Sequence, residues 1–410
     1  MMRRLLRNTS TLLIGNVGGA ALSFLLSILI GRVLGESGIG IYGVVMAWVF
    51  PARLLAEFGL GTLITRDVAR HVHAGPDYLH ATTAARLLLG GGLTLLLWLG
   101  APVLSDDPLV VLGLRVSAPL VLIEPFFGAF TAIFRAEGVM WPISWLSIGM
   151  LVAQVGGTAL VFLGGGGVIA ALLVNLLTSA GQLVAAWAIY RWRFWRPLGG
   201  QRLDVGDLLR RAWPFALAAV LVTLQARVGI ILLERLADAG QAGHYTVAGR
   251  FVEAARMAPN AFFGALLPAL AALRLQPEVF HRTFTQATLG LAGFGVLVGL
   301  AAGVFAGPLV ALTYGPAFSP AVPVLQVAMW GLLPSLLRGG RTLYWYALGR
   351  EGSVNRVMAA LLVMQVVLGA WLIPHHGAVG AALAALIAET VALALLWWGV
   401  PWPAREAAQA

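Results

Sequence analysis

The chain has 410 residues, of which 60% are hydrophobic and only 11% are charged, whereas soluble domains carry about 25% charged residues. This composition excludes an ordinary soluble domain and indicates a membrane protein. The net charge of +10 does not indicate nucleic-acid binding, because the arginines fall mainly in alternate short loops, and the absence of cysteine excludes disulfides and cysteine-ligated metals.

Twelve apolar stretches follow one another along the chain. A hydrocarbon core about 30 Å thick needs about 20 apolar residues in each helix that crosses it. The sequence therefore predicts an all-α integral membrane protein with 12 transmembrane helices. The stretches cover residues 9–34, 38–64, 79–104, 108–134, 140–163, 166–190, 208–233, 240–270, 283–312, 321–347, 353–373 and 377–398.

Loop arginines orient these helices. The segment MRRLLR at the amino end and the connections after every second helix are rich in arginine, whereas the other connections carry little positive charge. Arginine-rich loops stay on the cytoplasmic side of a membrane. We therefore expect both termini to be cytoplasmic. Arg135, Arg202, Arg274 and Arg282 are among the residues that carry this argument.

The chain is a doubled unit. Residues 203 positions apart match repeatedly between 28–69 and 231–272, and a shift of 211 aligns LVAQV from Leu151 with LVMQV from Leu362. Six helices return the chain to its starting side, which predicts a parallel repeat about an axis along the membrane normal. The predicted parts are an N-terminal six-helix lobe (1–192), a cytoplasmic linker (193–207) and a C-terminal six-helix lobe (208–410).

Charged residues inside the apolar stretches are the main functional signal, because each is costly unless it faces protein or water. Arg53 and Arg256 are repeat counterparts, each about fourteen residues into its helix and therefore near the middle of the membrane. In the eighth helix, Arg250, Glu253, Arg256 and Asn260 fall on one face. That face is expected to line protein or water.

Two interpretations of these charges stay open. In one, Arg53 with Glu57, and Glu253 with its arginine neighbours, only neutralise each other as buried pairs. In the other, a water-filled central cavity with surplus positive charge receives an anionic headgroup, because the planar fork of arginine binds diphosphate in a bidentate manner. The second interpretation predicts a substrate site made of Arg53, Arg256, Arg250, Arg227 and Asn260.

The acidic residues within the apolar stretches are predicted either to bind a coupling ion or proton or to balance the charge of the arginines. Glu124 and Glu389 either carry protons or pair with arginines on other helices. Pro51 and Pro259 lie close to the central arginines and predict helix kinks there. These kinks would serve as hinges, or the prolines reflect only the general frequency of proline in membrane helices. The acids are Glu57, Glu253, Glu124 and Glu389.

No cofactor or metal is predicted. His375 and His376 have no companion ligands, and no phosphate-binding GxxxxGK[ST] loop exists in a chain without lysine. If the chain moves a substrate across the membrane, the energy would then come from an ion gradient, the membrane potential or the substrate gradient.

The stretch from Asn8 to Arg70, with IGRVLG, IYGVVMAW and GLGTLITRDVAR, resembles the start of oligosaccharide flippases of the polysaccharide-export family. That family shares a superfamily with lipid II flippases and MATE multidrug exporters. The resemblance implies movement of an undecaprenyl-diphosphate-linked oligosaccharide from the inner to the outer leaflet of a bacterial or archaeal cytoplasmic membrane by alternating access. Its implied partners are this lipid-linked sugar, membrane lipids and polysaccharide polymerases or glycosyltransferases, and we expect a monomer without enzymatic activity.

The resemblance also bears on the site residues. Lipid II flippases, to which the chain is similar, have cavity arginines on the first, second and eighth helices. Arg53 and Arg256 correspond to the arginines of the second and eighth helices. The first helix has no arginine between Asn8 and Ile30, so Arg227 or Arg250 is expected to replace it.

Two other function classes are considered. MATE exporters typically use membrane-embedded acids for cationic substrates, whereas arginine predominates here. O-antigen ligases and polymerases need a sizeable outer loop, and the longest outer loop here, from Tyr314 to Pro323, has only ten residues.

Overall fold

The computed structural model describes residues 2–200, 204–273, 275–348 and 350–398. Arg202 and Arg274, part of the predicted 193–207 linker and the carboxyl-terminal residues 399–410 lie outside this description. The described residues are almost entirely helical and include no strand. The predicted all-α fold class is therefore confirmed.

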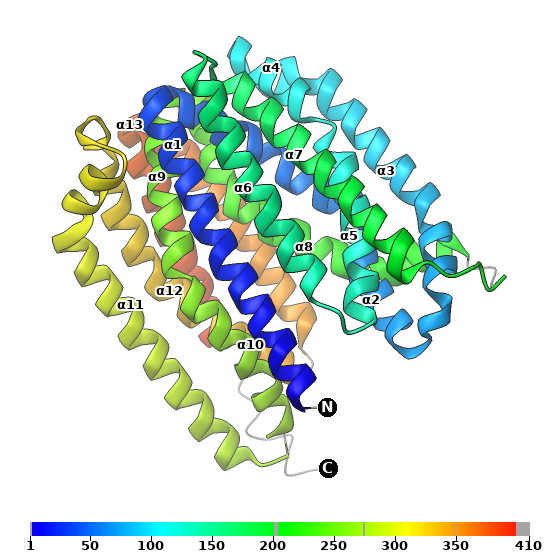
Figure 1. Cartoon of the computed structure of the whole chain (residues 1–410). Coiled ribbons are helices and arrows are strands. Elements are labelled where there is room, and N and C mark those ends of the chain that lie inside the picture. The colour runs from blue at the N-terminus through cyan, green and yellow to red at the C-terminus, as the bar shows by residue number, and fades with distance from the viewer. Residues whose placement is uncertain (1, 201–203, 274, 349, 399–410) are drawn as a thin grey trace. The chain divides into compact units, whose positions relative to one another are not determined.

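The chain divides into two compact units, Met1–Thr223 and Leu224–Ala410. Figure 1 colours the first unit from blue to green and the second from green to red. The first unit contains α1 (Met2–Glu57), α2 (Leu60–Arg70), α3 (Gly75–Leu104), α4 (Pro108–Ser117), α5 (Leu120–Ala136), α6 (Trp141–Leu163), α7 (Val168–Ile189), the turn η2 (Tyr190–Phe194) and the start of α8 (Val205–Leu236). The second contains the rest of α8, α9 (Ala239–Ala255), α10 (Met257–Ala272), α11 (Pro277–Thr313), α12 (Ala321–Ala347) and α13 (Glu351–Trp398).

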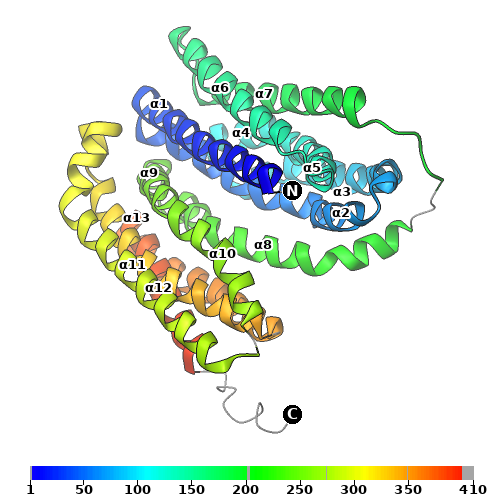
Figure 2. The ribbon, with the colours of Figure 1, turned by 60° about the horizontal axis from the view of Figure 1, so that its bottom comes forward.

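Glycines reverse the chain inside the two longest helical segments. A straight helix of the 56 residues of α1 would be far longer than a bilayer is thick, at 1.5 Å per residue. Gly35 instead adopts φ 70 and ψ −167, a conformation that side chains other than glycine avoid. Figure 2 shows the two blue arms of α1 side by side. Gly377, with φ 53 and ψ −132, interrupts α13 in the same manner.

The crossings add up to the predicted number. Among the described residues, eight helical stretches are long and apolar enough to cross a membrane, including 11–70 with 60 residues and 354–398 with 45 residues. Those two stretches hold two passes each, which raises the number to ten, and α8 and the α9–α10 pair supply the remaining two. The structure thus agrees with twelve crossings.

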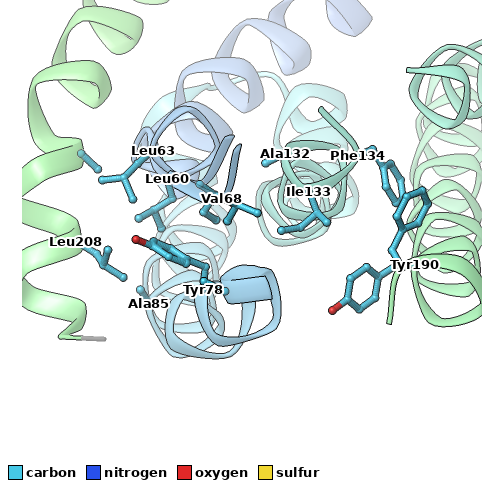
Figure 3. Close-up of a cluster of buried hydrophobic side chains, with 14 of the residues drawn as sticks. Leu60, Leu63, Val68, Tyr78, Ala85, Ala132, Ile133, Phe134, Tyr190 and Leu208 are labelled. Atoms are coloured by element: carbon cyan, nitrogen blue, oxygen red, sulfur yellow. The ribbon is translucent and has the colours of Figure 1, made fainter. Parts of the chain in front are cut away.

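The first unit is held together at one end by a cluster of buried apolar side chains. Figure 3 shows Leu60 and Val68 of α2 meeting Tyr78 of α3, Ile133 of α5 and Leu208 of α8. Their packing fixes the position of α2 after the chain breaks at the end of α1.

A buried carboxylate sits beside this cluster. Asp67 is 8% exposed and accepts hydrogen bonds from the Tyr78 hydroxyl at 3.2 Å, from Arg66 Nε at 3.0 Å and from Arg211 Nη2 at 2.5 Å. Because a buried charge must be paired, these contacts tie α2 to α3 and α8. The segment GLGTLITRDVAR therefore has a structural role in this unit.

Arginine also has a structural role in the second unit. Arg341 on α12 is fully buried, and its guanidinium lies over the rings of Tyr344, Trp345 and Trp397 at 4.5, 4.9 and 5.0 Å. Its Nε donates to the carbonyl oxygen of Leu396 at 3.3 Å. Cation–π contacts in a water-free site stabilise such a charge, so Arg341 fastens α12 to the end of α13.

Candidate functional site

Arg53 on α1 forms an ion pair with Glu124 on α5. Its Nη1 lies 2.5 Å from Glu124 Oε2, and its guanidinium lies 4.1 Å from the centre of the Phe50 ring. The two charged side chains are 28% and 29% exposed. The predicted pairing of Arg53 with Glu57 is therefore wrong, because the partner comes from a helix that the sequence does not place beside it.

Glu57 instead caps a helix. The chain breaks at Phe58 and Gly59, which have φ values of 53 and 70, and α2 begins directly afterwards. Glu57 Oε1 accepts a hydrogen bond of 2.8 Å from the backbone N–H of Gly61. The first N–H groups of a helix have no partner within the helix, so this carboxylate supplies one across the break.

Glu253 on α9 is shared between two arginines of the second unit. Arg227 Nη2 lies 3.4 Å from its Oε1, and Arg250 Nη1 lies 3.0 Å from its Oε2. The predicted pairing of Glu253 with its arginine neighbours therefore holds for Arg250, whereas Arg256 contacts Ser335 instead. The Glu253 side chain is 49% exposed, so this group is open to its surroundings.

Arg256 lies at the break between α9 and α10. Pro259 follows three residues later and has no N–H to donate to the carbonyl of Ala255, which ends α9 at that point. Arg256 Nη2 donates to the Ser335 hydroxyl at 2.9 Å, while its Nε is buried without a hydrogen-bond partner among the described residues. No carboxylate in the described part of the chain forms an ion pair with Arg256.

The Ser335 hydroxyl connects Arg256 to a buried carboxylate. It donates to Glu389 Oε1 at 3.2 Å, and the same oxygen accepts from Gln225 Nε2 at 2.9 Å and from Arg338 Nη2 at 3.1 Å. Arg338 Nε donates to the other oxygen of Glu389. Glu389 is only 7% exposed. Both Glu124 and Glu389 therefore pair with arginines on other helices, as the charge-balancing alternative predicts.

The repeat relates the two arginine contacts. Arg53 and Arg256 are 203 positions apart, and Glu124 and Ser335 are 211 positions apart, the shift of the second repeat block. Helices α5 and α12 also end at residues 136 and 347, which differ by 211. Each unit thus holds its arginine against the equivalent helix position. A carboxylate neutralises the arginine in the first unit, whereas an uncharged hydroxyl contacts it in the second.

The prolines near these arginines differ in effect. Helix α1 continues through Pro51, and its only non-helical residue is Gly35, so Pro51 does not break the helix and the kink there stays a prediction. Pro259, in contrast, accompanies a break. Asn260 is exposed on α10 one turn beyond Arg256, whose carbonyl accepts from the Asn260 backbone N–H at 2.9 Å.

Sequence reasoning missed three polar residues of these helices. Gln225 and Ser335 carry no charge, so nothing in an apolar helix pattern marks them as partners of Glu389. Arg86 on α3 is 1% exposed and donates from Nη1 to the Thr82 hydroxyl. Its position inside the apolar stretch 79–104 is the signal that would have identified it.

The family described as polysaccharide biosynthesis protein matches residues 5–274, which include Arg53, Arg227, Arg250 and Arg256. No curated protein matches the chain.

Solved structures match over nearly the whole chain. A multidrug resistance MATE family transporter of the MOP superfamily, inward-facing, has a TM-score of 0.78 at 15% identity over 93% of each chain. The lipid II flippase MurJ, in an inward closed conformation, has a TM-score of 0.78 at 15% identity over 94% of this chain and 86% of its own. A MOP superfamily transporter from Pyrococcus furiosus has a TM-score of 0.67 at 14% identity, covering 97% and 94%. These similarities establish a multi-pass membrane fold of the type found in these transporters.

Proposed function

The chain belongs to the polysaccharide biosynthesis protein family, and we propose that it is a flippase for an undecaprenyl-diphosphate-linked oligosaccharide. In this proposal the sugar moves from the inner to the outer leaflet of a bacterial or archaeal cytoplasmic membrane by alternating access.

The observation that carries the proposal is the environment of Arg256. It is contacted by a hydroxyl where its repeat counterpart is contacted by a carboxylate. Glu389 lies on the far side of that hydroxyl, so no carboxylate of the described residues contacts Arg256 directly, and a membrane-embedded cation in such a position marks functional sites. A diphosphate would place a negative charge in direct contact with Arg256 and accept hydrogen bonds from the N–H groups of its guanidinium fork.

The remaining site residues have graded roles in this proposal. Arg227 and Arg250 share the carboxylate of Glu253. In this proposal each would give up some of its hydrogen bonding to Glu253 and bind the diphosphate instead. Asn260 is exposed one turn from Arg256 and would donate to a phosphate or sugar oxygen. Arg53 would bind the substrate only after its ion pair with Glu124 breaks. The acids Glu57, Glu253, Glu124 and Glu389 balance charge.

A cation exporter fits these contacts less well. Such a protein needs a carboxylate available to a positively charged substrate. Among the described residues, Glu253 already contacts two arginines, and Glu389 contacts an arginine, a glutamine and a serine.

The function is tested by reconstitution. Proteoliposomes that contain the purified protein and lipid-linked oligosaccharide from the source cells are treated with an impermeant glycosidase. We expect the cleaved fraction to rise from about half, the share in the outer leaflet of the vesicles, toward all of the substrate, and protein-free vesicles to stay near half. Transport of cationic dyes without any movement of the oligosaccharide would refute the proposal in favour of a multidrug exporter.

The proposed orientation gives a labelling prediction. Because the chain has no cysteine, single-cysteine variants can be made directly. Asp106, Ser319 and Leu198 are exposed in connections. An impermeant maleimide should label Asp106→Cys and Ser319→Cys in intact cells, but Leu198→Cys only after lysis. Labelling of Leu198→Cys in intact cells would overturn the assignment of both termini to the cytoplasm.

A further inference from the structure

The first unit contains a pocket of about 390 Å³ between α3, α5 and α7. This volume lies in the range of small-molecule and cofactor sites. Its walls are apolar except for a threonine and the buried Arg86. The side chains used below are Arg86 of α3, Phe126, Ala129 and Phe130 of α5, and Val184 and Trp187 of α7.

The exposed side chains of the pocket wall both belong to α7. Val184 is 61% exposed and Trp187 is 54% exposed, whereas Ala129 at the inner wall is 3% exposed. Because α7 crosses the membrane, its exposed apolar side chains face lipid chains and not water. Tryptophan is typical of the zone where lipid chains meet headgroups. A ligand therefore enters this pocket sideways, from the bilayer.

Among the described residues that line the pocket, Arg86 is the only one with a charged side chain. Its Nη1 donates to Thr82, but Nε and Nη2 are buried without a hydrogen-bond partner in the described ranges. Glu57 is close enough to act on it electrostatically, yet Glu57 Oε1 bonds to the N–H of Gly61. A buried guanidinium with two unused donors is unfavourable, and an anion in the pocket would satisfy them.

Packing on both sides of the pocket keeps its walls in place. Figure 3 shows Tyr78 and Ala85 of α3, Ile133 of α5 and Tyr190, just beyond α7, as part of one buried cluster. These residues flank the pocket along the same helices. The apolar walls are therefore held in place, and the Arg86 side chain, whose Nε and Nη2 are buried, has to turn toward the pocket to reach a ligand.

We propose that this pocket binds an anionic phospholipid of the surrounding membrane. One acyl chain lies against Phe126, Phe130 and Trp187, and the phosphate accepts hydrogen bonds from Nε and Nη2 of Arg86. The apolar walls and lateral mouth select a lipid over a soluble phosphate, and the guanidinium selects an anionic headgroup over a zwitterionic one. This site is separate from the arginines proposed to bind the transport substrate, so it does not depend on the proposed function.

Native mass spectrometry of the purified protein with phosphatidylglycerol or phosphatidylcholine tests the proposal. We expect phosphatidylglycerol to be retained in preference, and Arg86→Gln to weaken its binding about tenfold or more, the effect of losing a charge-assisted hydrogen bond. The matched control is Arg191→Gln. Arg191 is exposed just beyond α7, with its guanidinium 4.6 Å from the Trp195 ring, and its loss should leave phosphatidylglycerol binding unchanged.

A second variant tests the pocket without touching the charge. Val184→Trp should narrow the mouth and weaken phosphatidylglycerol binding, and because Val184 faces lipid, this change should not affect folding even if Arg86→Gln does. Equal binding by wild type and Arg86→Gln, or equal losses in Arg86→Gln and Arg191→Gln, would refute the site. Displacement of phosphatidylglycerol by millimolar sodium phosphate, with Val184→Trp having no effect, would show that a free anion binds Arg86 and would also overturn the proposal.

Discussion

Replacing Arg256 by alanine is expected to reduce transport of the lipid-linked oligosaccharide strongly while the protein remains in the membrane at near-normal abundance. The substitution removes one hydrogen bond from the guanidinium to a neutral hydroxyl, worth about 1.5 kcal/mol. It leaves no acid unpaired, because Glu389 keeps Arg338 and Gln225. Two charge-assisted bonds to a diphosphate are worth about 3 kcal/mol or more. Transport in proteoliposomes should therefore fall by roughly 100-fold or more.

The choice of replacement separates charge from geometry. Arg256→Lys keeps the positive charge but loses the planar fork, so transport should lie between that of alanine and wild type. Arg256→Glu should be worse than alanine, because it places a negative charge where the diphosphate would bind.

Ser335→Ala is the matched control, since it removes the hydroxyl partner of Arg256 and keeps the guanidinium. We expect this variant to transport within a few-fold of wild type. Disappearance of Arg256→Ala from the membrane, with abundance restored by Arg256→Ala/Ser335→Ala, would instead give Arg256 a structural role. Dye transport that improves with Arg256→Glu would identify a cation exporter.

The sequence was sufficient to predict the crossings because hydropathy and helix length are properties of each segment alone. It could also predict that Arg53 and Arg256 occupy equivalent positions, since the repeat relates them directly. The sequence did not predict the side chains that these residues contact. Arg53 and Glu124 are 71 positions apart, and Arg338 and Glu389 are 51 apart. A pattern along one helix gives the face of a residue but does not give the helix that packs against that face.

The repeat would have yielded one partner if its second shift had been applied to the charged residues. Moving Glu124 by 211 positions arrives at Ser335, which contacts the repeat counterpart of Arg53. A search for charged residues in apolar helices does not identify this equivalence, because serine is uncharged. The equivalence explains how a doubled chain has two arginines in similar positions with unequal charge balance. The absence of a carboxylate at Ser335 is thus as informative as the presence of Arg256.

The buried pair of Arg338 and Glu389 gives the prediction with the largest effect on stability. Their side chains are 12% and 9% exposed. Replacing Glu389 by leucine would leave Arg338 as an uncompensated buried charge and would remove the acceptor of Gln225 and Ser335. Breaking such a pair by removing one partner typically costs about 3–5 kcal/mol. We expect Glu389→Leu to be depleted from the membrane and to unfold at a markedly lower temperature in detergent.

The double variant Arg338→Leu/Glu389→Leu should restore most of that stability, because two apolar side chains replace two charges that no longer need each other. The matched control is Glu253→Ala, which breaks the contacts of a side chain that is 49% exposed and should lower the free energy of unfolding less than Glu389→Leu does. The same variants test whether Glu389 has a role in energy coupling. If Glu389→Leu is as stable as wild type, and if neither it nor the double variant transports although both are folded, the carboxylate carries an ion or proton during transport. Rescue of both stability and transport by the double variant would leave Glu389 with charge balance alone.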